Sequence, residues 1–489
     1  MKKVIGLVAL VLIIVLGAYD GMGYLTERKL REEINVLRQA NGVNIQVNRY
    51  QRGWFSSDAL FNWQLHIPAQ TIKTNDQIQI IPAKDLNFPL AARIHHGPMM
   101  FSKGKLQFGL GALQTVVTLP QEYIASFKQV FSDASVEPQL FVDFFLNYFG
   151  TARLRANLPA FNLTTKEGNK HFEWMGGKAT TKISSNLNHV KGVLNLQGTS
   201  ASVDQAKLQG EKAKIRYDLH RTPQGLFLGN VNAFVPSLKI TEGNKHLLSL
   251  DDFYMDSDAD IQAGLFNTKL KLTLKGLGLE NKHYGEGKLD LTVSNLNAEA
   301  LTQLNEKMNL AQQGSEVQRK TAMLSMIAPL SQLFGQGAEL NVKEFMFTMP
   351  EGPVQGNLHI ALPKDAMNNL VEFTKKIQGN GKLTIPAAVM RQWVVSSIQE
   401  KMMAPQGSDT KTMMPAMEPS VDPDENARVA AKSTDLTQQV NSLADAQLAT
   451  LVQNGMLKPV GSNYVLEATL TQGNFTINGK PFDPEMMKF

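Results

Sequence analysis

Apolar side chains recur at every second position in many short segments of this chain of 489 residues. The alternation starts at 43–47 and resumes at 61–67, after a turn sequence at 51–53. In an extended segment, a period of two places every apolar side chain on the same face. Further alternating segments are 86–94, 106–110, 140–146, 193–196, 270–274, 289–293, 358–362 and 464–468. The sequence therefore predicts a body of many antiparallel strands, each with one apolar face.

Strand openings and turns repeat along the chain. Glu-Gly-Asn-Lys-His occurs at 167–171 and again at 242–246, and its Gly-Asn pair suits the left-handed backbone of a tight hairpin. A Gly-x-Leu pattern opens alternating segments at Gly104, Gly192, Gly287, Gly356 and Gly381. Because the spacings are unequal, the repeats indicate a recurring strand–turn unit and not a solenoid.

Leu140–Phe149 is the most apolar of the expected strands. Phe141, Phe145 and Phe149 add apolar side chains to the face opposite the alternating set. A strand that is apolar on both faces is predicted to lie between two layers, and Phe144→Asn is then expected to destabilise the fold. The sequence leaves two arrangements open, since the apolar faces could close on one another as a core or line a groove between curved sheets.

A few segments lack alternation and are predicted to be helices. They are 119–131, 297–309, 317–334, 386–402 and 436–454. Thr26–Ala40 is a further expected helix, whose apolar stripe at Leu30, Ile34 and Leu37 would dock on the body as a stalk.

The expected fold class is α+β and mostly β, with an N-terminal transmembrane helix followed by a large antiparallel β-rich body and a few helices. Residues 403–432 are polar and contain several Met and Pro residues, which is typical of a flexible linker. The expected parts are a membrane anchor at 1–25, a stalk helix at 26–42, a β-rich periplasmic body at 43–402, the flexible linker at 403–432, and a C-terminal helix-plus-strands module at 433–489 that packs on the body.

The anchor is predicted from the apolar run Val4–Tyr19, which follows Lys2 and Lys3. Extended to Leu25, the run has the length of a short membrane-spanning helix. Small residues suited to signal-peptidase cleavage are poorly placed, so an uncleaved anchor is favoured over a cleaved signal peptide. The lysines place the N-terminus in the cytoplasm and the body in the periplasm. The chain has no cysteine, which excludes disulfides, thiolate metal ligands and a lipid-modified cysteine as the anchor.

Familiar catalytic motifs are absent from the sequence. It has no G-x-S-x-G nucleophile elbow, no phosphate-binding loop and no H-E-x-x-H helix. His95-His96-Gly97-Pro98 is the best local candidate for a metal site, but adjacent strand residues point to opposite faces, so a turn is favoured. No catalytic, cofactor-binding or metal-binding residue is therefore assigned.

Two further clusters receive structural interpretations. Arg52-Gly53-Trp54 is interpreted as a hairpin turn in which the arginine packs over the tryptophan, the alternative being a surface recognition tip. A methionine cluster is interpreted as part of the linker and not as a soft-metal site. Its members are Met402, Met403, Met413, Met414 and Met417.

Several short motifs together resemble a known family. They are Tyr50-Gln51-Arg52-Gly53-Trp54-Phe55-Ser56-Ser57, His96-Gly97-Pro98, the Gly-x-Leu strand openings and the ending Asn478-Gly479-Lys480-Pro481-Phe482. Their order along the chain, with the N-terminal anchor, is similar to that of the YdgA/YihF family of uncharacterised Gram-negative envelope proteins. The resemblance covers essentially the whole length. It implies an inner-membrane anchor and periplasmic exposure, and it offers no catalytic residue.

The composition narrows the range of partners. The net charge of +5 comes from 49 basic and 44 acidic residues without a Lys/Arg block, so nucleic acid is not an expected partner. We expect a non-enzymatic binding or assembly module without a cofactor, held in the inner-membrane bilayer. A carrier of lipid or another amphiphile is the alternative, and a hydrolase of envelope polymers is less favoured. A second copy of the chain and an envelope protein stay open as partners.

The anchor prediction can be tested with a reporter that is active only in the periplasm. Fused after residue 489, it should give its signal in the membrane fraction, because the apolar run would hold the protein there. Recovery of the signal in the soluble periplasm would show that the segment is cleaved.

Overall fold

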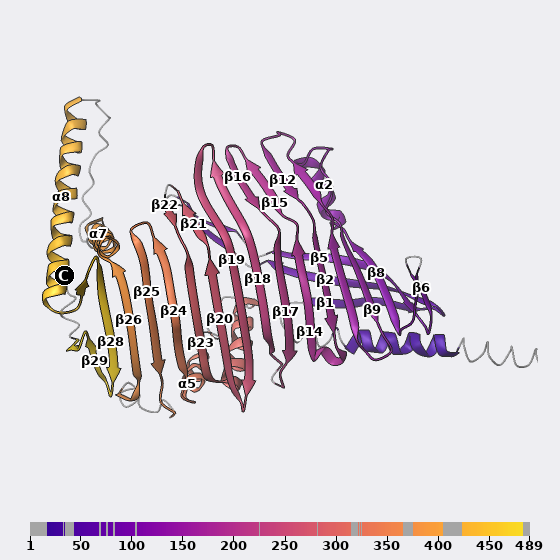
Figure 1. Cartoon of the computed structure of the whole chain (residues 1–489). Coiled ribbons are helices and arrows are strands. Elements are labelled where there is room, and N and C mark those ends of the chain that lie inside the picture. Colours follow the sequence, from indigo (N-terminus) through magenta and orange to yellow (C-terminus); the bar gives the residue numbers. More distant parts are fainter. Residues whose placement is uncertain are drawn as a thin grey trace, which may run out of the picture.

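One long antiparallel sheet forms most of the molecule in the computed structural model (Figure 1). The structure describes residues 17–32, 34, 44–67, 70–74, 77–81, 84–102, 105–223, 225–280, 282–313, 321, 323, 325–364, 375–403 and 423–482. Within these residues, antiparallel strands dominate and helices are few. The predicted mostly-β class is therefore confirmed.

The main row of strands runs through the sheet in nearly sequential order. Its first strands are β1 (Asn44–Arg52), β2 (Ser56–Ile67), β5 (Lys84–His96), β8 (Gly111–Val117) and β9 (Leu140–Leu146). Its middle strands are β10 (Ala152–Leu158), β13 (Gly177–Ile183), β14 (His189–Leu196), β17 (Ala213–Arg221), β18 (Phe227–Glu242), β19 (Lys245–Gln262), β20 (Leu265–Leu274) and β23 (Gly287–Asn297). Its last strands are β24 (Glu339–Met349), β25 (Gly352–Ala361), β26 (Gln378–Pro386), β28 (Asn463–Thr471), β29 (Asn474–Ile477) and β30 (Lys480–Pro481), with β27 (Lys458–Val460) also paired to β28.

Strands β18 and β19 are longer than their neighbours and widen the sheet. The second half of β18 pairs with β16, and the first half of β19 pairs with β21. The strands attached in this way are β11 (Phe161–Thr164), β12 (Lys170–Trp174), β15 (Thr199–Val203), β16 (Ala206–Gly210), β21 (Gly276–Leu279) and β22 (Lys282–Tyr284). Two small hairpins stand apart, β3 (Gln70–Thr74) with β4 (Gln77–Ile81) and β6 (Met100–Ser102) with β7 (Lys105–Gln107).

The helices lie between or before the strands. They are a helix over residues 17–32, α2 (Gln121–Val130), the short 3-10 helix η1 (Ser185–Leu187), α3 (Ala298–Gln313), α5 (Ile327–Phe334), α7 (Ala387–Met403) and α8 (Pro423–Gln453). The helices predicted at 119–131, 297–309 and 386–402 are confirmed to within a few residues, whereas α5 is shorter than the expected 317–334. Helix α8 starts inside the expected linker, of which residues 404–422 lie outside the described part, and the first helix runs across the expected boundary at residue 25.

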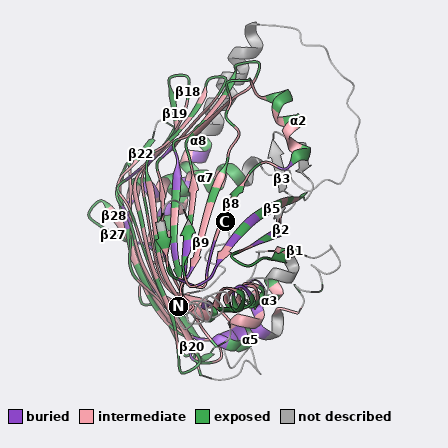
Figure 2. Cartoon of the chain, turned by 90° about the vertical axis from the view of Figure 1, so that its right-hand side faces the viewer, coloured by how far each residue is buried: buried purple, intermediate pink, exposed green. Residues whose placement is uncertain are grey.

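Buried apolar side chains gather where these helices cover the sheet. Near the N-terminus, Ile34 packs with Phe61 and Ile94 of β2 and β5. Helices α3 and α5 cover Leu296 at the end of β23. Helices α7 and α8 form the other clusters, which include Leu448 and Ile385. Figure 2 shows α3, α5 and α7 on the same side of the sheet, which we call the inner face.

Strand β9 is not enclosed between two layers, so that prediction is wrong. Phe141 is 39% exposed and Phe149, just after the strand, is 87% exposed. Phe144 is half-buried, and within 140–149 Leu146 alone is fully buried. The second set of apolar side chains lies on the outer face of a single sheet, where no described element packs over Phe141.

No helix among the described residues is long and apolar enough to cross a membrane. Residues 1–16, which hold most of the predicted anchor, lie outside the described part of the chain.

Helix α8 offers a matched test of the packing at the C-terminal end. Leu448 is buried at 7% exposure, whereas Leu443 on the same helix is 46% exposed. We expect Leu448→Ala to lower the free energy of unfolding by about 2–5 kcal/mol, because it removes buried apolar contacts and leaves a cavity. Leu443→Ala should change it by less than about 1 kcal/mol. Equal effects of the two substitutions in denaturant titrations would contradict the described packing of α8.

Candidate functional site

The inner face carries an unbroken row of apolar side chains across the middle of the sheet. Each member lies directly opposite the next in the strand register, from β9 to β23. The row consists of Val142, Ala156, Ala179, Leu194, Ile215, Ala233, Met255, Leu272 and Leu289. All nine are half-buried. We call this set the apolar row.

No member of the apolar row belongs to a buried cluster of the described structure. The clusters lie at the two ends of the sheet and under α3 and α5. A strand face that is apolar normally packs against a second layer, since exposed apolar surface is costly. The described chain supplies that layer at the ends of the sheet and under α3 and α5, and the row is therefore the candidate surface for a ligand.

The row extends over a length that suits a hydrocarbon chain. Its nine strands, at the ~4.8 Å spacing of paired strands, span about 38 Å. The hydrocarbon core of a whole bilayer is about 30 Å thick. One or more extended acyl chains could therefore lie across these strands.

The neighbouring positions on the inner face are also mainly apolar. The hydroxyl of Tyr217, which lies among them, has a hydrogen-bond partner. Leu154, Val231 and Leu270 lie one register step from the apolar row. In the same step, a Cβ at Gly192 would come within 2.4 Å of the Tyr217 hydroxyl, so the glycine makes room for the tyrosine. The Tyr217 hydroxyl lies 2.6 Å from Thr181 Oγ1. The inner face thus presents no unpaired donor from this tyrosine.

The outer face of the same strands is polar and charged. One residue along from the apolar row, the register runs through Asp143, Arg155, Thr180, Val193, Arg216, Asn232, Asp256, Lys271 and Asp290. Lys271 Nζ lies 3.5 Å from Asp290 Oδ2 across β20 and β23. The outer face can therefore stay in water while the inner face binds apolar groups.

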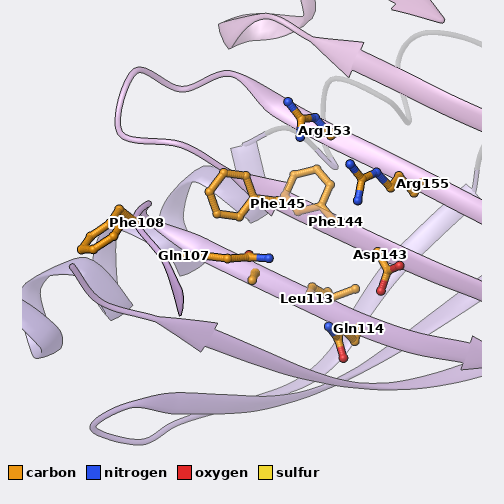
Figure 3. Close-up of a pocket in the computed structure, with 10 residues that line it drawn as sticks. Gln107, Phe108, Leu113, Gln114, Asp143, Phe144, Phe145, Arg153 and Arg155 are labelled. Atoms are coloured by element: carbon orange, nitrogen blue, oxygen red, sulfur yellow. The ribbon is translucent and has the colours of Figure 1, made fainter. Parts of the chain in front are cut away.

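A cavity of about 290 Å³ lies on the outer face near β8, β9 and β10 (Figure 3). Arg153 and Arg155 border it on one side, with Phe145 and Asp143 on the adjacent strand. Its lining holds a single carboxylate, whereas glycoside hydrolysis usually needs a pair. The cavity could take an anion, but it does not favour the hydrolase alternative.

Among the described residues, one group of side chains has the spacing to hold a metal ion. It consists of His189, Asp218 and His220. His189 Nε2 lies 2.5 Å from Asp218 Oδ1, and Lys191 Nζ lies 2.6 Å from Asp218 Oδ2. These hydrogen bonds, from His189 first and then Lys191, lower the pKa of Asp218 to about 2. The two imidazole rings are stacked at 4.7 Å with an interplanar angle of 11°, so a metal in the plane of one ring lies outside the plane of the other.

This group is better explained as a surface ion pair than as a metal centre. Sequence reasoning did not find it, because His189 and His220 are 31 positions apart and only strand pairing places them opposite each other.

The structure separates the two histidines that sequence analysis singled out. His96 is fully buried beneath the N-terminal helix, where a Cβ on Gly23 would come within 2.7 Å of its ring. His95 lies on the opposite strand face, as expected from alternation. Neither ring nitrogen of His96 has a hydrogen-bond partner among the described residues, and burial lowers its pKa. The pair cannot share a metal ion.

The structure also bears on the Arg52-Gly53-Trp54 turn and on the methionine cluster. Arg52 lies over the ring of Tyr24, with Cζ 5.9 Å from the centroid, and Trp54 is 61% exposed. The predicted stacking of Arg52 on Trp54 is therefore wrong, because the N-terminal helix supplies the ring instead. The side chains of the methionine cluster lie outside the described part of the chain.

Comparisons with known proteins identify a family but no chemistry. The model of a family described as bacterial protein of unknown function (DUF945) matches residues 1–485. Protein YdgA of Escherichia coli (strain K12) is 22% identical over 342 residues, which are 65% of this chain and 64% of that relative. The chain thus matches just under two thirds of the relative's length. No solved structure matches the chain.

Because His96 is buried, we expect the protein to lose stability in acid. Burial favours its neutral form, so its pKa is lower in the folded protein than in the unfolded chain, where it is about 6.5. Below pH 6.5 the unfolded chain binds more protons, and the stability falls as the pH falls towards the folded pKa. We expect the melting temperature of His96→Gln to depend less on pH between 7.5 and 5 than that of the unmodified protein.

His95→Gln is the matched control for this titration, since it removes a neighbouring imidazole from the opposite face. It should keep the pH dependence of the unmodified protein. A His96→Gln protein with an unchanged slope would show that this imidazole is not shielded from protons.

Proposed function

This chain belongs to the DUF945 family of bacterial proteins of unknown function, and from that premise we propose that it binds the apolar chains of an amphiphile, such as a lipid, along its inner face. The protein would act as a non-enzymatic binding module. The observation that carries the proposal is the apolar row, which crosses nine strands and has no member in a buried cluster of the described structure.

The chemistry of the row favours a lipid chain over a protein partner. Its side chains are aliphatic, apart from the thioether of Met255, and offer no hydrogen bond. The backbone groups around them are already paired in the strand ladders. A protein interface usually forms about one hydrogen bond per 100–200 Å² and is enriched in aromatic residues and arginine. An acyl chain needs neither, because its burial is non-directional.

Binding of this kind would also explain the helices at the ends of the sheet. They bury the apolar strand faces at Phe61 and Ile385. These buried regions would hold the sheet folded while its middle stays available. A sandwich with a closed core would instead cover Leu194 and Ile215, which are half-buried.

We place the protein in the inner membrane with its body in the periplasm. The support comes from the sequence, in which Lys2 and Lys3 precede the apolar run Val4–Tyr19. A membrane location would also bring the inner face close to a source of lipid. Assembly with a second copy or an envelope protein would be compatible with this function.

Photocrosslinking can test the binding of lipid in the full chain in cells. We expect the photoreactive residue p-benzoylphenylalanine at position 194 to form adducts with phospholipid mass, because Leu194 points to the inner face. At position 193 it should form none, because Val193 is on the same strand and points to the outer face. Equal lipid adducts at both positions, or adducts with protein alone at 194, would contradict the proposal.

The substitution Leu194→Asn distinguishes an open face from a closed core. On an open face it should lower the free energy of unfolding by less than about 1 kcal/mol and reduce co-purifying lipid several-fold. In a closed core it would bury an unpaired amide and cost about 1–3 kcal/mol or more. Val193→Asn is the control and should retain the lipid. Denaturant titration and mass spectrometry of extracted lipid measure the two effects.

A further inference from the structure

Six large apolar side chains are more than half exposed at the end of the molecule where the N-terminal helix begins. They are Trp54, Phe55, Phe101, Leu106, Phe108 and Phe149, with exposed fractions from 54% to 87%. We call them the aromatic collar. Figure 1 shows β6 and the N-terminal helix at the same end of the sheet, opposite α8.

The collar comes from three separate parts of the chain. Trp54 and Phe55 form the turn between β1 and β2. Phe101 and Leu106 face each other in the β6–β7 hairpin, which Phe108 follows. Phe149 lies in the turn between β9 and β10. Such turns normally expose polar residues, so apolar side chains in all three call for an explanation.

Tyr19 of the N-terminal helix contacts two of these three parts of the chain. Its ring lies 4.9 Å from the ring of Phe55, and its hydroxyl donates a 2.7 Å hydrogen bond to the Met99 carbonyl. Gly97, with φ of +125°, allows this approach, since a Cβ there would come within 2.0 Å of the Tyr19 ring. Tyr148, next to Phe149, donates a hydrogen bond to the Pro98 carbonyl. The parts of the collar are therefore linked to the first described turn of the helix, two of them through Tyr19 and the third through Pro98.

The collar is not a part of the nearby core. The N-terminal cluster uses Ile34, with Leu30 beside it, against Phe61 and Ile94, and it contains no collar residue. Arg52, two residues before Trp54, is paired, because its Nε lies 3.6 Å from Asp20 Oδ1. The carboxylate of Asp20, next to Tyr19, thus already faces a cation.

We infer that the aromatic collar docks on the interfacial region of a lipid bilayer. The helix that it contacts is preceded in the sequence by the apolar residues 4–16, and no other run of the chain approaches that length. Tryptophan favours the level of the lipid headgroups, and Phe and Leu side chains insert into the boundary between headgroups and acyl chains. The collar contacts Tyr19, the last residue of this apolar run, which favours the membrane over a protein partner as its occupant.

Docking through the collar fixes the direction of the body. Phe108 lies just before β8 and Phe149 just after β9, and the apolar row starts in β9. With the collar on the bilayer, the row would therefore start near the membrane and lead away from it. The inference concerns the position of the body and holds whether or not the inner face binds lipid.

Single cysteines can test the depth of the collar, because the chain contains none of its own. Phe101→Cys and Phe149→Cys place an environment-sensitive NBD label in the collar. Val460→Cys, in an exposed strand at the opposite end of the sheet, is the matched control. Each full-length variant is reconstituted in phosphatidylcholine and phosphatidylglycerol vesicles that contain a lipid with a nitroxide near its headgroup.

We expect the nitroxide lipid to reduce the emission of both collar labels at least twofold, while iodide on both sides of the membrane has little effect on them. The Val460 label should show the reverse. Collar labels that iodide quenches as strongly as the control would place the collar in water and overturn the inference. Labels shielded from both quenchers would show that protein covers the collar, which would overturn it as well. If p-benzoylphenylalanine at position 194 gives no lipid adduct while the collar labels are quenched as expected, the proposed amphiphile binding is refuted. The inference about the collar then still holds.

Discussion

The strand register is the constraint on which the rest of this structure depends. Side chains alternate with a period of two, so a slip of one residue between any two strands would move the apolar set of one strand to the polar face. Over nine strands every pairing is in the register that keeps Val142 in line with Leu289. One sheet therefore has one continuous apolar face and one polar face, because every strand turns its apolar side the same way.

Local irregularities maintain this alignment where the sequence breaks its own period. Val342 and Phe345 in β24 are three positions apart, and a strict alternation would place them on opposite faces. The register shift between them lets both face inwards, opposite Leu358 and Gly356. A similar shift in β23 accompanies the left-handed backbone of Asn295 at φ of 61° and turns Leu296 towards α3. Bulges of this kind re-aim side chains without breaking the sheet.

A single sheet cannot bury its own apolar face, so the coverage of that face decides both stability and function. The helices place Ile34, Leu304 and Leu448 against it and account for the fully buried clusters. More coverage would add stability and would remove the surface available for a ligand. The distribution of buried clusters, dense under the helices and absent along the apolar row, is consistent with a protein that retains this surface for binding.

The sequence alone determined the local features of this protein. The alternation in segments such as 270–274 identified strands, and the loss of alternation identified α2, α3 and α7, because both periods are local properties of the backbone. It also placed His95 and His96 on opposite faces. The apolar row could not be assigned as a ligand-binding surface in this way. An apolar strand face has the same sequence pattern in a closed core and on an open sheet.

Only the tertiary structure decided which strands are neighbours and what covers them. Phe141 and Phe149 suggested a second layer above β9, yet both are exposed. His189 and His220, and the three turns of the aromatic collar, meet through contacts between distant segments. Burial depends on such long-range packing, which the period of a single segment does not encode.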